Sequence, residues 1–95
     1  MKLCDLHTHV LPDIDDGAPT IEYALQMLRN AAASDVELLA VTPHCNGPYR
    51  NYLDVHLQDR FLQLQQAAKD VPVDLVLGAE VRVDESWYKI FLYCW

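Results

Sequence analysis

Three short apolar runs along the chain alternate with two stretches of helical periodicity. The runs Lys2–Leu6, Glu37–Thr42 and Val71–Leu77 are bounded by polar residues, Pro or Gly, which is typical of buried strands. In the stretches between them, apolar residues recur three and four positions apart, first at Ile21, Ala24, Leu25 and Leu28 and then at Leu53, Leu57, Phe61, Leu64 and Ala68. This spacing predicts two amphipathic helices, the first with Thr20 as its N-cap and an end near Ser34.

The predicted order of elements is therefore β-α-β-α-β. Strands that alternate with helices imply right-handed crossovers and a parallel sheet, so the sequence predicts the α/β class. The segments Leu11–Pro19 and Asn46–Asn51 contain Gly and Pro, and we expect both to be loops.

The last nine residues, 87–95, do not continue this order. They hold five of the nine aromatic side chains and lack the polar face of a surface helix. One interpretation is a final hydrophobic strand, or a helix packed under the sheet. The other, which we favour, is a truncated or frameshifted reading frame, with residues 1–86 as the domain portion and 87–95 as an atypical tail.

Composition and charge narrow the classes of function. The 95 residues are 52% hydrophobic and 22% charged, which fits one small globular domain rather than a disordered chain. Fourteen acidic and seven basic residues give a net charge of −7. Such a chain repels a nucleic-acid backbone, so nucleic acid is not an expected partner, whereas cations suit it as ligands.

The cysteines and the N-terminus bear on cellular location. Cys4, Cys45 and Cys94 are an odd number at wide spacing, which predicts neither a disulfide framework nor a CxxC zinc site. The segment Met1–Asp5 lacks the apolar region of a signal peptide, and no run approaches the roughly 20 apolar residues of a membrane span. We therefore expect a soluble, cytoplasmic protein.

Metal-capable side chains follow each predicted strand. His7 and His9 come after the first strand, and residues i and i+2 of an extended chain point to the same side. Asp16 lies in the next loop, His44 follows the second strand, and Glu80 follows the third. The carboxyl ends of parallel strands meet at one edge of a sheet, so these five side chains should converge there. Mixed imidazole and carboxylate ligands suit zinc, manganese or iron.

Each candidate also has an ordinary alternative. Strand-end histidines are common, and Asp15 and Asp16 before Gly17 can be plain turn residues. Asp5 either orients a histidine or is a simple strand acid. His56 lies on the second predicted helix, so we interpret it as a surface or partly packed residue rather than a ligand. The coincidence of candidates at three successive strand ends is what favours a metal site.

Other hydrolytic chemistries fit the sequence poorly. The two serines, Ser34 and Ser86, do not suggest a Ser-His-Asp site, and neither GxGxxG nor GxxxxGK[ST] occurs. Cys45 and Arg50 are separated by one residue too few for a thiolate phosphatase loop, and Pro48 between them offers no N–H. We therefore do not expect Cys45 to be a nucleophile.

Three segments carry a resemblance to a known family. DLHTHVLPDIDDGAPTIEYALQML, VTPH and LVLGAEVR closely resemble the polymerase and histidinol phosphatase (PHP) family. More narrowly, they resemble its bacterial manganese-dependent protein-tyrosine phosphatases of capsule and exopolysaccharide synthesis. The resemblance runs from about Leu3 to about Arg82. It implies a distorted (β/α) barrel with a trinuclear metal site, of which this chain would be the N-terminal β-α-β-α-β portion with parallel strands.

The resemblance also implies ligands, a reaction and a partner. The positions that fall on ligands of that family are His7, His9, Asp16, His44 and Glu80. The expected metal is Mn²⁺, with Zn²⁺, Fe or Mg²⁺ as alternatives. The implied reaction is hydrolysis of a phosphomonoester, here phosphotyrosine on a bacterial tyrosine kinase. Arg50 and Arg82 are candidates to clamp the phosphate, and an exposed solubilising arginine is the alternative for both.

Length sets this chain apart from a whole barrel, which needs roughly 200 or more residues. We therefore expect an N-terminal piece that is weakly active or inactive as given. Its uncovered sheet edge and aromatic tail should promote self-association. Two alternatives stay open: a non-catalytic remnant that binds metal, and a PHP-type phosphatase that acts on a small phosphorylated metabolite.

Overall fold

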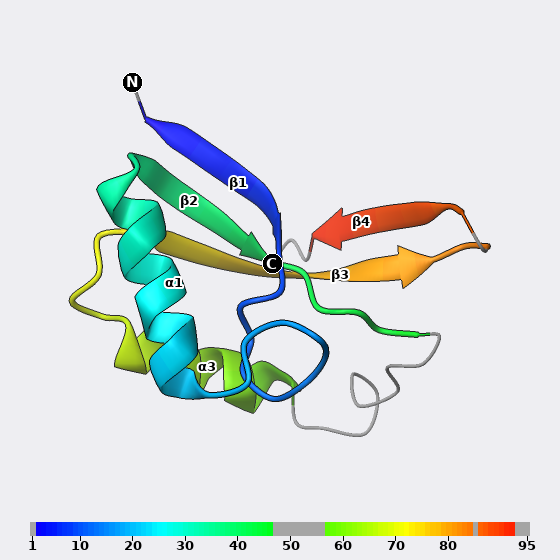
Figure 1. Ribbon diagram of the computed structural model, residues 1–95, viewed down its shortest axis with the longest axis horizontal. Coiled ribbons are helices and arrows are strands. Elements are labelled where there is room, and N and C mark those ends of the chain that lie inside the picture. The colour runs from blue at the N-terminus through cyan, green and yellow to red at the C-terminus, as the bar shows by residue number, and fades with distance from the viewer. Residues whose placement is uncertain (1, 47–56, 85, 93–95) are drawn as a thin grey trace.

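The computed structural model describes residues 2–46, 57–84 and 86–92, and this part of the chain has a mixed α/β fold (Figure 1). Its elements are β1 (Leu3–Thr8), α1 (Ile21–Ala33), β2 (Val36–Val41), α3 (Leu57–Ala67), β3 (Asp74–Arg82) and β4 (Tyr88–Leu92). The strands form one sheet in the order β1-β2-β3-β4, and both helices lie on the same side of it. The α/β class expected from the sequence is confirmed.

The sheet is curled because β3 has different partners along its two halves. Its first half, from Asp74 to Leu77, pairs in parallel with β2, which itself pairs in parallel with β1. Its second half, from Gly78 to Arg82, pairs antiparallel with β4. The expectation that the three predicted strands are parallel is therefore confirmed for β1, β2 and β3, and β4, which lay outside that expectation, joins the sheet antiparallel.

The sequence suggested that the third strand ends at Gly78, and this is wrong. β3 continues through Gly78 to Arg82, so Glu80 lies within the strand rather than after it. A glycine fits this position because two backbones come close together. A Cβ at Gly78 would stand 2.2 Å from the carbonyl oxygen of Phe91 in β4. A glycine inside a strand can mark such an approach as readily as it marks a turn.

The first strand also runs further than predicted, through His7 to Thr8. Thr8 stays in the sheet because its polar groups bond to the neighbouring strand region. Its hydroxyl donates to Ala40 O at 2.6 Å, and its N–H donates to Thr42 Oγ1 at 3.1 Å. The change from apolar to polar residues after Leu6 therefore does not mark the end of the strand, and most residues of β1 are exposed rather than buried as expected.

The two helices lie where the periodicity places them. Thr20 is the N-cap of α1, as predicted, and its side chain accepts a hydrogen bond from Tyr23 N. The helix ends at Ala33, beside the expected Ser34. The second predicted helix corresponds to α3, and Leu53, its first apolar position, lies outside the described residues.

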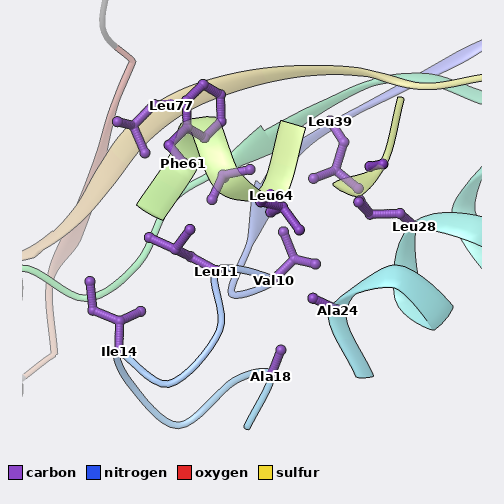
Figure 2. Packing of buried hydrophobic residues seen from close by; sticks show 12 residues of the cluster. Val10, Leu11, Ile14, Ala18, Ala24, Leu28, Leu39, Phe61, Leu64 and Leu77 are labelled. Atoms are coloured by element: carbon purple, nitrogen blue, oxygen red, sulfur yellow. The ribbon is translucent and has the colours of Figure 1, made fainter. Parts of the chain in front are cut away.

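One hydrophobic core fills the space between the helices and the sheet (Figure 2). Leu28 of α1 and Leu64 of α3 are fully buried and pack with Leu39 of β2 and Leu77 of β3. The loop after β1 contributes four more buried side chains to the same cluster, namely Val10, Leu11, Ile14 and Ala18. This loop is therefore part of the packed structure, which matters because it carries Asp15 and Asp16.

The chain after Arg82 turns back to form β4, whose five residues are all exposed. This is the hydrophobic strand that we had considered for the tail, while residues 93–95 lie outside the described part. The expected self-association through the sheet edge and tail stays a prediction. None of the described helices is long and apolar enough to cross a membrane.

Candidate metal centre

The chain that follows β2 continues beside β3 and so places His44 next to Glu80. Glu80 N donates to Pro43 O at 2.9 Å, and Cys45 N donates to Glu80 O at 3.2 Å. These two hydrogen bonds form a parallel bridge between His44 and Glu80 beyond the end of β2. Residues separated by 36 positions in the sequence are thereby fixed as neighbours by the backbone alone.

His7 and His9 reach the same point from the end of β1. Their ring Nε2 atoms lie 3.2 Å apart, which confirms that the two side chains point to the same side. The ring of His9 also stands edge-on to the ring of His44, with centroids 4.4 Å apart. Three imidazoles therefore gather where the ends of β1 and β2 meet β3.

Glu80 lies at the middle of this group. Its Oε1 is 3.0 Å from His7 Nε2, and its Oε2 is 3.1 Å from His9 Nε2 and 2.9 Å from His44 Nδ1. The Glu80 side chain is only 8% exposed, so water screens its charge poorly. A single buried carboxylate thus contacts all three imidazoles.

Asp16 closes the cluster from the loop after β1. Its Oδ1 accepts a hydrogen bond from His9 Nδ1 at 3.1 Å and lies 3.5 Å from His44 Nε2. The hydrogen bond from His9 lowers the pKa of the Asp16 carboxyl below its usual value of 3.8, and the proximity of His44 adds to this effect. Asp16 is the most exposed of the acids in the cluster, so it faces the solvent side.

The donor set fits divalent cations. The candidate ligand atoms fall into two overlapping groups, each within 4.8 Å: His7, His9 and Glu80 form one, and His9, Asp15, Asp16 and His44 form the other. Glu80 Oε2 is buried and accepts no hydrogen bond of good geometry from the described residues, although two ring nitrogens lie within 3.1 Å. A buried carboxylate oxygen surrounded by imidazole nitrogens is a donor set that suits a divalent cation such as zinc or manganese.

The other residues singled out in the sequence have different surroundings. Asp5 accepts a hydrogen bond from the backbone N–H of His7 at 3.1 Å, so its described contact is with the main chain and not with an imidazole. Arg82 Nε donates to Asp84 O at 3.3 Å, and its role in phosphate binding stays a prediction. Arg50 and His56 lie outside the described residues. Burial raises the pKa of the Cys45 thiol, which agrees with the view that it is not a nucleophile.

Two residues near the centre were not assigned by sequence reasoning. Asp15 had been treated as a turn residue, yet its side chain is fully buried beside His9. Tyr88 of β4 stands with its ring centroid 6.4 Å from that of His44. The register of β4 against β3 brings Tyr88 there, and a pattern of apolar residues gave no information on that register.

The structure is thus a mixed α/β chain in which imidazoles and carboxylates form groups that could hold a metal ion. The family model for "Capsular polysaccharide synthesis, CpsB/CapC" matches residues 3–91. The chain therefore belongs to the CpsB/CapC family.

Individual relatives agree with this assignment. The tyrosine-protein phosphatase YwqE of Bacillus subtilis is 31% identical over 84 residues, or 85% of this chain. The tyrosine-protein phosphatase CpsB of Streptococcus pneumoniae is 30% identical over 81 residues, or 83% of this chain. The chain spans about a third of the length of these relatives, 33% of each.

The fold agrees as well. A solved structure from the set of YwqE and CpsB crystal structures, which are described as metal-dependent tyrosine phosphatases, matches 86% of this chain. The match has a TM-score of 0.73 and 30% sequence identity, and it covers 34% of that structure's chain. The resemblance to bacterial tyrosine phosphatases of capsule synthesis, inferred from the sequence motifs, is thereby confirmed.

Proposed function

We propose that this chain supplies part of the metal centre of a phosphotyrosine phosphatase, with His7, His9, Asp16, His44 and Glu80 as metal ligands. The observation that carries this proposal is the contact of one buried carboxylate, Glu80, with all three imidazoles. Membership of the CpsB/CapC family and the names of the relatives support the reaction class. The metal is Mn²⁺, with Zn²⁺, Fe or Mg²⁺ as the alternatives to be compared.

In this proposal the curled sheet is the first portion of a distorted (β/α) barrel of the PHP type. The parallel order β1-β2-β3 with both helices on one face supports it, since that face would be the outside of the barrel. The ligands then lie where the carboxyl ends of β1 and β2 meet β3, on the side of the sheet where α/β proteins bind substrates.

Each side chain has a distinct role. Glu80 and the three histidines hold the cations, and the imidazoles must be neutral to do so. Asp16, held by His9 at 3.1 Å, offers a carboxylate on the exposed side of the cluster. Divalent ions in such a centre act as Lewis acids toward phosphoryl oxygens. Arg82, two residues beyond Glu80 on β3, and Arg50 are the side chains proposed to bind the substrate phosphate.

The proposed substrate is a phosphotyrosine protein, namely a bacterial tyrosine kinase of capsule or exopolysaccharide synthesis, and the proposed location is the cytoplasm. Turnover by these 95 residues should be weak. Five ligand side chains cannot fill the coordination of three ions at about four to six ligands each.

The test is hydrolysis of a phosphotyrosine peptide with Mn²⁺, measured for the wild type, Glu80→Gln and the charge-matched control Glu22→Gln. Glu22 lies in the first turn of α1 and is exposed. We expect weak release of phosphate that disappears with chelator and in Glu80→Gln and persists in Glu22→Gln. Turnover that needs no metal, or a wild type that neither binds Mn²⁺ nor releases phosphate, would refute the proposal.

A further inference from the structure

Asp15 joins three separate parts of the chain through one buried carboxylate. Its Oδ1 accepts a hydrogen bond from the backbone N–H of Gly17 at 2.9 Å, within the loop after β1. Its Oδ2 accepts one from the backbone N–H of His44 at 2.9 Å, beyond the end of β2. The same Oδ2 lies 3.6 Å from His9 Nδ1. The side chain is 0% exposed, so water does not compete for these bonds.

We infer that Asp15 is a positioning residue, which sets the distance between the Asp16-bearing loop and His44. This inference rests on the proposed metal centre, because Asp15 matters for function only if Asp16 and His44 bind the same cation. Asp15 and Asp16 are consecutive but have opposite surroundings: one is buried against backbone amides, and the other is 55% exposed beside two imidazoles. The buried acid holds the loop in place and thereby presents its neighbour.

The hydrogen bonds of Asp15 argue against a role as a metal ligand. Each of its two oxygens accepts a hydrogen bond from a main-chain N–H. A bond from Asp15 to a cation would compete with these hydrogen bonds, and a buried amide left without a partner is costly. The carboxylate, in turn, is buried and negative and depends on the same two N–H groups for its stabilisation.

Replacement of Asp15 by asparagine tests the positioning role, because it removes one hydrogen-bond acceptor with almost no change in size. An asparagine has one carbonyl oxygen, and its amide group cannot accept a hydrogen bond. Asp15→Asn therefore loses the bond from either Gly17 or His44, because the two N–H groups lie at different oxygens. Asp13→Asn is the matched control, since Asp13 is exposed in the same loop and asparagine tolerates its φ of 55°.

The first measurement uses the metal-free chain. We expect the amide protons of Gly17 and His44 in the wild type to resonate downfield, as N–H groups bonded to a buried carboxylate do. At least one of them should move upfield in Asp15→Asn, and neither should move in Asp13→Asn. Mn²⁺ affinity, measured by calorimetry, should fall about tenfold or more in Asp15→Asn, which is usual for residues that orient metal ligands. The control should stay within twofold of the wild type.

A second measurement needs only the wild type, so it stands even if Asp15→Asn does not fold. Zn²⁺, which is diamagnetic, is titrated while the His44 amide is observed by NMR. The amide proton should stay downfield when the site fills. An upfield move on binding would show that Asp15 turns to the ion as a ligand, and equal Mn²⁺ affinity in Asp15→Asn would also overturn the inference. A wild type without affinity for either metal would refute the metal centre instead, whatever the His44 amide shows.

Discussion

Gly17→Ala should damage the loop and the metal centre together, because Gly17 is packed directly against His9. A Cβ at position 17 would stand 1.9 Å from the carbonyl oxygen of His9 and 2.5 Å from its Cβ. Ordinary contacts of a Cβ with other heavy atoms are at least 3 Å, and neither neighbour is the end of a flexible side chain. The loop must therefore retreat from His9 by about 1 Å or more.

The retreat breaks interactions that the structure defines. Ala18 N donates to His9 O at 2.9 Å, and a shift of this size takes that bond beyond hydrogen-bonding distance. Overpacking costs about 1–3 kcal/mol, and an unsatisfied buried backbone group costs about 1–3 kcal/mol. The lower chain entropy of alanine in the unfolded state returns about 0.4–1 kcal/mol. We expect a net destabilisation of about 1–5 kcal/mol.

Urea unfolding followed by circular dichroism, in the presence of chelator, measures this change without any contribution from metal. Asp13→Asn, an exposed change in the same loop, should stay within about 0.5 kcal/mol of the wild type. Mn²⁺ affinity should also fall in Gly17→Ala, because Asp16 moves with the loop away from His9. A Gly17→Ala variant as stable as the control would show that the loop does not press on His9, and the reasoning would fail.

Two further predictions concern the same loop. Arg60→Ala should destabilise the chain by roughly 1 kcal/mol, because Arg60 Nη1 donates to the carbonyl oxygens of Pro12 and Asp13 at 3.1 and 3.2 Å. Urea unfolding measures this loss, and an equal loss in Arg29→Ala, which removes an exposed arginine of α1, would contradict the prediction. Because folding lowers the pKa of Asp16, the carboxylate stabilises the metal-free chain above pH 3.8, and this stabilisation is lost as the pH falls through the pKa of the folded chain. In Asp16→Asn the stability should therefore fall less steeply with acid than in the wild type. Equal acid dependence of stability in the two proteins would argue against this prediction.

The sequence predicted the parts of the fold that depend on local patterns. The spacing of Leu28 and its neighbours gave α1, and the capping preference of threonine gave its start at Thr20. The alternation of side chains along an extended chain correctly placed His7 and His9 together. The rule that parallel strands end at one edge of a sheet also brought His44 to them, whereas Glu80 joins the group from within β3 rather than from its end. These inferences hold because each needs only neighbouring residues or a general rule of parallel sheets.

What the sequence could not provide was pairing between distant segments. Gly78 was interpreted as a stop because nothing in the sequence reveals that Phe91 of β4 approaches it. Asp15 was interpreted as a turn residue because its second hydrogen bond goes to His44, 29 positions away. An Asp-Asp-Gly sequence in a loop predicts a turn whether or not the end of another strand packs against it. For both Gly78 and Asp15, contacts with distant parts of the chain determine the structure.

The central claim is that His7, His9, Asp16, His44 and Glu80 form a shared cation site, and calorimetric titration of Mn²⁺ tests it most directly. The proteins to compare are the wild type, His9→Ala and His56→Ala. His9 belongs to both groups of candidate ligand atoms, whereas the sequence predicts that His56 is not a ligand. We expect binding by the wild type and by His56→Ala, a large loss in His9→Ala, and weaker binding as pH falls through about 6, where imidazole becomes protonated. Equal Mn²⁺ affinity in the wild type and His9→Ala would contradict the assignment of the site.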